Sequence, residues 1–331
     1  MAILLTFLIF LMLLLIPFIP ALLELLKPTD ASPLFIRMDY SKDARYFGNS
    51  FRNILKNAII TDMDIGMREV KLSKDEIVEI AQSKRIGKGE RYEHILYILG
   101  SLITEEKARF DKEIYVKGDA VIGCENVLRA IACDGRLSIS SGVTIIRWVD
   151  AEGGIEISDN CNLGISLSSS NGVKIGKDCR FKRLYGMPIM TYKDIERGYK
   201  VGLDNTQCPI DEDHLIISPF TKIEKDLIVR KGLLIKKGCV LVGSIKTYGN
   251  LIIEGDTTVF GNIFSEADIE IGERTTVRGD VFSQGSVTVR QGVKIGDVGK
   301  VKSVIGKRRI MINDDVTIYG YVMTEGVGMV V

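Results

Sequence analysis

The sequence is poor in the groups that most enzymes use. It has two histidines, His94 and His214, and it contains no G-x-S-x-G, P-loop or H-E-x-x-H motif. A group formed by Cys208, Asp211, Asp213 and His214 resembles a metal site in composition, but it lacks the tight ligand spacing of one. We therefore predict no catalytic residues, no metal and no cofactor, and a protein that is not an enzyme.

An excess of charge of one sign is also missing. The chain has 44 basic and 43 acidic residues, so its net charge is +1. A nucleic-acid surface needs a basic excess on one face, and we expect no nucleic-acid partner. No C-x-x-C pair occurs among the six cysteines, which removes the usual zinc and redox patterns. Cys161, Cys179 and Cys239 share one inward column, where we predict buried, unpaired thiols; a disulfide ladder is the less favoured alternative.

What the sequence does have is an internal repeat of eighteen residues. The segments 232–249, 250–267 and 268–285 align so that aliphatic residues fall into fixed columns, with a glycine column that includes Gly261. A fixed period of short alternating segments with glycine corners is typical of a solenoid, whose turns stack and share one core. The column residues predicted to form this core include Leu233, Ile235, Leu251, Ile253, Ile269, Ile271, Val277, Ile310 and Ile312.

The columns extend over residues 113–326 and predict an all-β solenoid of about ten turns. We expect a β-helix, with a right-handed coil favoured. The repeat is interrupted at about residues 186–213, which we interpret either as a binding loop or as a loop that covers one side of the solenoid. We expect residues 327–331 to form a short C-terminal tail.

The N-terminal segment is strongly apolar. Residues 2–23 carry no charge and include Ile3, Leu14, Pro17 and Leu23. Twenty-two residues give a helix of roughly 33 Å, so we predict a transmembrane helix within residues 1–26; a signal peptide is the alternative. Lysine and arginine residues follow the segment and none precedes it within the chain. The positive-inside rule therefore predicts a single-pass protein of the cytoplasmic (cell inner) membrane with its body in the cytoplasm.

Residues 27–112 do not keep the phase of the repeat. Helical spacing of apolar residues predicts a helix over about 41–59. We expect Arg52 to lie on a solvated face of it; contact with anionic lipid headgroups is the alternative. A capping-box pattern from Ser73 to Glu76 predicts a second helix that ends near Ser83. We interpret the region as a small α+β module that links the anchor to the solenoid and caps its first turn.

The spacing x-[ILV]-x-[IV]-G-x₄-V-x-G-x-[IV] in residues 249–296 resembles that of the bactofilins, the polymer-forming cytoskeletal proteins of bacteria. The resemblance is clearest over 214–326. It implies a right-handed β-helix that assembles end to end into non-polar filaments without nucleotide, at the inner face of the membrane, and organises proteins of cell shape or wall synthesis. The longer solenoid, the insertion and the N-terminal module depart from the family pattern.

The leading hypothesis is a membrane-anchored scaffold whose partners are further copies of itself, the membrane and other envelope-assembly proteins. The alternative is a β-helix enzyme, such as a hexapeptide-type acyltransferase or a polysaccharide-acting protein. Self-association is expected at exposed solenoid ends, where strand edges are unpaired, and along an outward stripe on one flank. The residues predicted for these contacts are Tyr319, Tyr321, Val322 and Met329 near the C-terminal end, and Phe260, Phe264 and Phe282 on the flanks.

Overall fold

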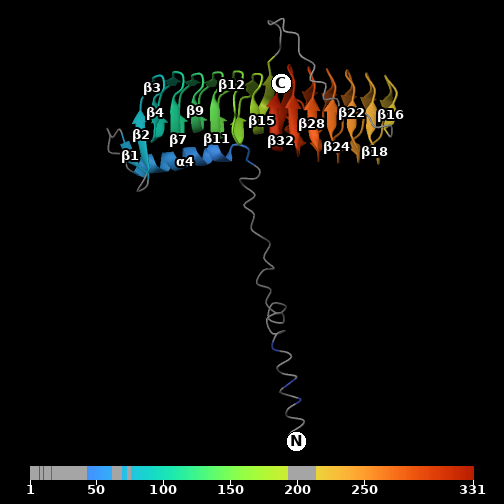
Figure 1. The fold of residues 1–331 in the computed structure, drawn as a ribbon, viewed down its shortest axis with the longest axis horizontal. Helices are drawn as coiled ribbons and strands as arrows, with labels where there is room; N and C mark the ends of the chain where they lie inside the picture. Colours follow the sequence, from blue (N-terminus) through green and yellow to red (C-terminus); the bar gives the residue numbers. More distant parts are fainter. Residues whose placement is uncertain are drawn as a thin grey trace. The chain divides into compact units, whose positions relative to one another are not determined.

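The structure is a computed structural model that describes residues 43–61, 69–72, 76–192 and 214–331, together with Phe7, Phe10 and Ile16. The chain divides into two compact units, Met1–Ala44 and Arg45–Val331. Nearly all described residues belong to the second unit, which is a β-solenoid of about 13 turns with one helix against its flank (Figure 1).

The described elements of this unit fall into three groups. The first is the helix α4 (Tyr46–Thr61) and the short strand β1 (Glu69–Lys71). The first stack of turns contains β2 (Ile77–Ala81), β3 (Lys84–Ile86), β4 (Arg91–Tyr92), β5 (Ile95–Ile98), β6 (Leu102–Thr104), β7 (Arg109–Val116), β8 (Ala120–Ile122), β9 (Val127–Cys133), β10 (Leu137–Ile139), β11 (Thr144–Ala151), β12 (Ile155–Ile157), β13 (Ser166–Ser169), β14 (Val173–Ile175) and β15 (Arg180–Thr191). The second stack contains β16 (Leu215–Ile217), β17 (Lys222–Ile223), β18 (Leu227–Val229), β19 (Leu233–Ile235), β20 (Val240–Leu241), β21 (Ile245–Thr247), β22 (Leu251–Ile253), β23 (Thr258–Val259), β24 (Ile263–Ser265), β25 (Ile269–Ile271), β26 (Thr276–Val277), β27 (Val281–Ser283), β28 (Ser286–Val289), β29 (Lys294–Ile295), β30 (Lys302–Gly306), β31 (Arg309–Ile312) and β32 (Thr317–Val330).

Within each stack, successive turns pair in parallel and in register. Leu233 pairs with Leu251, and Leu251 with Ile269, so residues eighteen apart lie directly over one another. Alternation along each strand then sends one side chain of two into the interior. Glycine is needed in this column because successive turns approach closely there: a Cβ on Gly261 would lie 2.2 Å from the Gly243 carbonyl oxygen. A larger residue there would force stacked backbones apart.

The two stacks meet with their strands running in opposite directions. β15, the last strand of the first stack, pairs antiparallel with β32, the last strand of the second. Figure 1 shows these strands side by side in the middle of the unit, with β2 toward one end and β16 at the other. After β15 the second stack therefore begins at a distant end and winds back toward the first.

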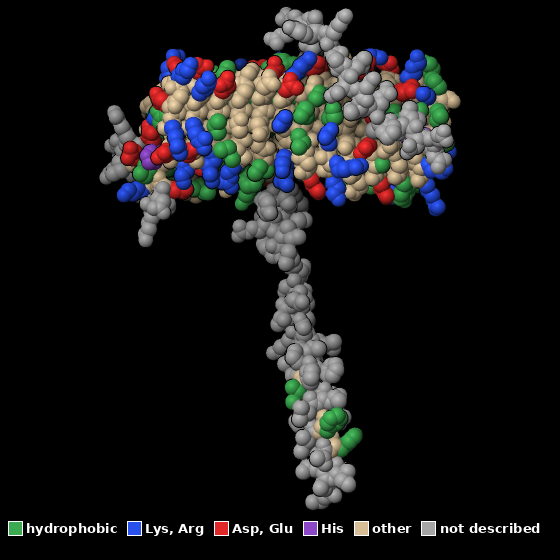
Figure 2. Space-filling view, viewed as in Figure 1, with side chains coloured by type: hydrophobic (Ala, Val, Ile, Leu, Met, Phe, Trp, Pro, Cys, Tyr) green, Lys and Arg blue, Asp and Glu red, His purple; other side chains and the backbone are tan. Residues whose placement is uncertain are grey.

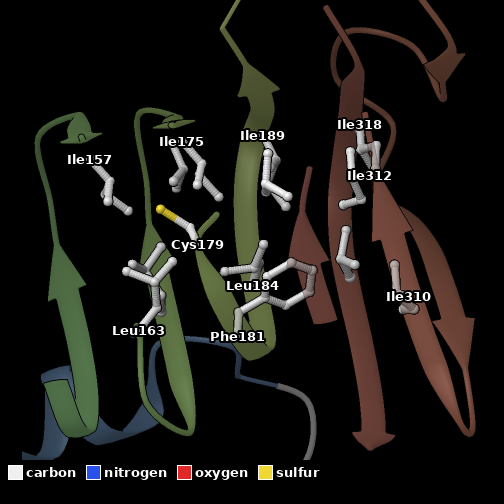
Figure 3. Packing of buried hydrophobic residues seen from close by; sticks show 14 of the residues in the cluster. Ile157, Leu163, Ile175, Cys179, Phe181, Leu184, Ile189, Ile310, Ile312 and Ile318 are labelled. Carbon is white, nitrogen blue, oxygen red and sulfur yellow. The ribbon is translucent and has the colours of Figure 1, made fainter. Parts of the chain in front are cut away.

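One aliphatic core runs through both stacks and across this junction. Figure 3 shows Ile157, Ile175 and Ile189 of the first stack in line with Ile318 and Ile312 of the second. The nine column residues singled out from the repeat, Leu233, Ile235, Leu251, Ile253, Ile269, Ile271, Val277, Ile310 and Ile312, are all buried in it. The β-helix expected from the repeat is what the structure shows.

Two parts of the predicted fold class need correction within the solenoid. The turns number about 13 rather than ten, because residues 76–112 form strands of the first stack instead of a separate α+β module. The helix predicted from Ser73 to Ser83 is wrong: Ile77–Ala81 is β2, which pairs with β5 and contributes the buried Val78. The helix predicted over 41–59 is present as α4.

The predicted transmembrane helix is also corrected. A membrane-spanning helix needs about 20 consecutive apolar residues, and no helix among the described residues is long and apolar enough to cross a membrane. The prediction of a transmembrane segment within 1–26, and with it the single-pass membrane location, is therefore not supported. The four residues named for that span, Ile3, Leu14, Pro17 and Leu23, lie outside the described residues.

Candidate functional site

The C-terminal residues predicted to meet another copy lie inside the junction. Tyr321 packs against Tyr185 with 4.7 Å between ring centroids, and Val322 is buried opposite Leu184. Met329 pairs with Arg180, while Tyr319 is half-buried near Lys294. The expected free end of the solenoid is thus occupied by β15 of the same chain.

Polar contacts close the junction at both sides of this strand pair. Thr191 Oγ1 donates to the Asn313 carbonyl oxygen at 2.8 Å and accepts from the Val316 N–H at 2.9 Å. Lys177 and Asp314 form an ion pair at 3.0 Å. Phe181 fills the space above Gly328, where a Cβ would lie 2.2 Å from the ring. The junction is therefore a packed interface with paired backbone edges.

The end of the second stack is different. Among the described residues, β16, β17 and β18 pair with the following turn on one edge and with nothing on the other. Apolar side chains are exposed there: Leu215 by 51%, Ile216 by 58%, Phe220 by 74% and Ile228 by 72%. Leu215 belongs to the column in which Leu233 is fully buried. We refer to residues 214–231 as the uncapped turn.

The opposite end, at the start of the first stack, is closed at β2 only; among the described residues, β3 and β4 have no partner on their outer edges. β1 pairs antiparallel with the edge of β2, and Val78 and Ile86 of that first turn are buried. Strands β3 and β4 carry charged residues, of which Arg91 forms an ion pair with Asp111 at 2.6 Å. Charged side chains on an edge strand disfavour further strand pairing. The two ends of the solenoid therefore differ in chemistry.

Helix α4 covers one flank of the first stack (Figure 1). Its Arg52 is 3% exposed and donates to the Asp134 carboxylate at 2.7 Å, to the Cys133 carbonyl oxygen and to Asp150. Arg45 donates to both oxygens of Asp150 at 2.8 Å. Gly48 lets the helix come close to the sheet, because a Cβ there would lie 2.4 Å from the Asp150 side chain. These contacts fix the helix to the solenoid.

The corresponding flank of the second stack carries an apolar row. Phe264 and Phe282 stack with centroids 5.4 Å apart and planes within 5°, and the row continues with Ile305 and Met323. Beside it lies a groove of about 650 Å³, which we call the flank groove; its lining includes Ile165, Lys182, Arg183, Phe282, Ile305, Lys307 and Met323. Phe260 follows β23, outside this row, beneath Arg278 at 4.7 Å.

The described residues hold no group of three His, Cys, Asp or Glu side chains that could bind a metal, and Cys208, Asp211 and Asp213 lie outside them. Cys161, Cys179 and Cys239 are buried free thiols. Burial raises the pKa of the Cys133 thiol to about 12, which keeps it protonated and unreactive. Figure 2 shows charges of both signs spread over the viewed face, with hydrophobic side chains in small groups.

Comparison with known proteins gives no relative: no family model, no curated protein and no solved structure matches this chain.

Proposed function

We propose that this chain is a non-catalytic structural scaffold that self-associates through the uncapped turn. The proposal follows the bactofilins, which its repeat spacing resembles and which assemble end to end without nucleotide. The observation that carries it is the contrast within one core column: Leu215 is 51% exposed, whereas Leu233 one turn further on is fully buried. A second copy that covered this end would restore the burial that every inner turn has.

The energetics favour such a contact. Full burial of an aliphatic or aromatic side chain contributes about 1.5–3 kcal/mol, and the uncapped turn exposes four of them. The unpaired edge also offers backbone N–H and C=O groups to an added strand. The junction between β15 and β32 supports the proposal, since it shows that ends of these stacks can join through backbone pairing. In this proposal the solenoid is a rigid platform that organises proteins of cell shape or envelope assembly.

Sedimentation velocity of the full-length chain, without nucleotide, tests the proposal. We expect oligomers at tens of micromolar. Leu215→Lys should shift the chain toward monomer, because it places a charge in the core column that the contact would cover, whereas the matched Val298→Lys, at a residue that is 79% exposed elsewhere, should not. A wild-type chain that stays monomeric at tens of micromolar would refute the proposal.

A second variant tests the backbone part of the contact. The Leu215 N–H donates to the Gly232 carbonyl oxygen, so alternation directs the Ile216 N–H toward the free edge. Ile216→Pro removes that donor and leaves the bonds to β19 intact, as proline at an edge strand allows. It should weaken self-association by at least tenfold. Oligomers that persist in both Ile216→Pro and Leu215→Lys would place the interface elsewhere.

A further inference from the structure

One outward-facing column of side chains runs along the same sheet face through both stacks. On the first stack, Val78 pairs with Ile95, and Ala130 pairs with Trp148. At the junction, Arg183 pairs with Met323. On the second stack the column continues through Ile305, Phe282, Phe264 and Lys246. The antiparallel junction thus extends one flank of the first stack into one flank of the second.

On the first stack, helix α4 packs over this column. Phe51 of α4 packs edge-on against Trp148 with centroids 5.6 Å apart, and Leu55 is fully buried. Beneath the helix, Val78, Ile95 and Trp148 are 1%, 3% and 7% exposed. The chain itself therefore demonstrates that an amphipathic helix laid across these turns fits the column.

On the second stack no described element covers the same column. Phe264, Phe282 and Ile305 stay half-buried, Met323 is 36% exposed, and the flank groove lies beside them. Four strand spacings separate Phe264 from Arg183, which is about 19 Å at 4.8 Å each. A helix of about 13 residues spans that distance, and α4, with 16 residues, is of similar length.

The charges of the two flanks are opposite. Under α4 the sheet presents the carboxylates of Asp134 and Asp150, which Arg52 of the helix and Arg45 just before it neutralise. Around the flank groove the exposed charges are Lys182, Arg183 and Lys307, none of which forms an ion pair within the described part of the chain, with Glu325 as the one carboxylate in the lining. A helix that fits here needs an apolar face and acidic flanks.

We propose that the flank groove and its apolar row bind an amphipathic helix of a partner protein whose polar face is acidic. The binding mode is helix-in-groove, with apolar anchors three and four residues apart that lie over Phe264, Phe282, Ile305 and Met323. Carboxylates of the partner helix pair with the cations at the groove edge. The basic helix α4 of a second copy does not meet this requirement, because its Arg52 and Lys56 would face Lys182 and Arg183.

Two peptides of the α4 sequence, residues 46–61, provide the test against the full-length chain. The acidic probe carries Arg52→Glu and Lys56→Glu, and the basic control keeps the native residues; both have the same apolar face. Fluorescence anisotropy of the labelled peptides should show saturable binding of the acidic probe, at least tenfold tighter than that of the control. Equal binding of both peptides, or no saturable binding of the acidic one, would overturn the proposal.

Variants of the protein locate the binding. Phe282→Ser should weaken binding of the acidic probe at least tenfold, whereas the matched Phe260→Ser, outside the column, should leave it unchanged. The double variant Lys182→Glu, Arg183→Glu should reverse the preference toward the basic peptide, an effect that a loss of folding cannot produce. If Phe282→Ser instead leaves probe binding intact and dissociates oligomers of the chain, the occupant is a second copy and the proposal fails.

Discussion

At the residue scale, Arg52 shows how a charged side chain is built into the solenoid flank. Its guanidinium bonds to Asp134, Asp150 and the Cys133 carbonyl oxygen, so its hydrogen-bonding capacity is largely met without water. The Tyr115 hydroxyl donates to Asp134 at 2.7 Å and lies in the same network. A buried charge of this kind is stable only while each partner is present.

Arg52→Ala should therefore destabilise the docked helix by about 3 kcal/mol, because it leaves two carboxylates with fewer partners in a buried site. Trp148, the single tryptophan of the chain, contacts Phe51 of α4 and reports the loss through its fluorescence during urea unfolding. The matched control is Arg274→Ala, which removes a solvent-exposed pair with Asp256. No change in the unfolding midpoint is expected there, and an equal shift in both variants would contradict the argument.

The sequence could not reveal the role of Arg52. Helical spacing over 41–59 predicts the helix correctly. An arginine on such a helix is ordinarily solvated, and we predicted a solvated Arg52, whereas the structure buries it. Asp134 and Asp150 lie 82 and 98 residues away, directly after β9 and on β11, and no local pattern connects them to Arg52. The buried columns, by contrast, depend on spacing within a turn and its neighbour, and for that reason the repeat reveals them.

At the element scale, the pair β15 and β32 determines how the two stacks meet. Gly328 sits against the Phe181 ring, and just before β15 the Asp178 N–H donates to the Val330 carbonyl oxygen while the Val330 N–H donates to the Cys179 carbonyl oxygen. The repeat did not predict this pair because the last turns of the first stack are shortened. Leu167 pairs with Leu184, and Val173 with Ile189, which are spacings of 17 and 16 residues rather than eighteen. The eighteen-residue phase of the repeat is lost at this point, so the sequence pattern indicates an interruption where the structure has a shortened turn.

Gly328→Ala should weaken the junction by about 1–3 kcal/mol, the usual cost of overpacking. The added Cβ would lie 2.2 Å from the Phe181 ring, so the ring or the strand must move. Thermal unfolding followed by circular dichroism measures the loss. Gly154→Ala is the control, since its Cβ would have no neighbour closer than 3.7 Å. Adding Phe181→Leu to Gly328→Ala should recover part of the loss; a further loss would contradict a steric cause.

At the scale of the whole molecule, the ends of the solenoid decide how far assembly can proceed. Among the described residues, one end has unpaired strand edges and exposed apolar side chains, while at the other β1 covers the edge of β2 and charged residues occupy β3 and β4. A single self-complementary surface gives a closed two-fold dimer, whereas open filaments need two competent ends. The sequence alone suggested a free C-terminal end, because aligned columns do not indicate in which direction a stack is placed.

We therefore expect the full-length chain to stop at dimers. Sedimentation equilibrium should give twice the chain mass over a range of concentrations, and electron microscopy should show particles of uniform length. Replacing exposed charges at the closed end, for example Arg85→Val with Arg91→Val, should permit larger species, because it removes the charges that disfavour strand pairing. Long filaments of the wild-type chain would show that the closed end is also competent.

The reversal at the junction has a consequence for recognition. Since the last turns of both stacks meet in the middle, each outer tip is a first turn, and backbone direction is the same at the two tips. A ligand that read main-chain geometry alone would find equivalent strand edges at both tips except at β2, where β1 already holds the place of an added strand. Discrimination between the tips therefore rests on β1 and on side chains: aliphatic and aromatic groups at one extremity, salt-linked groups at the other.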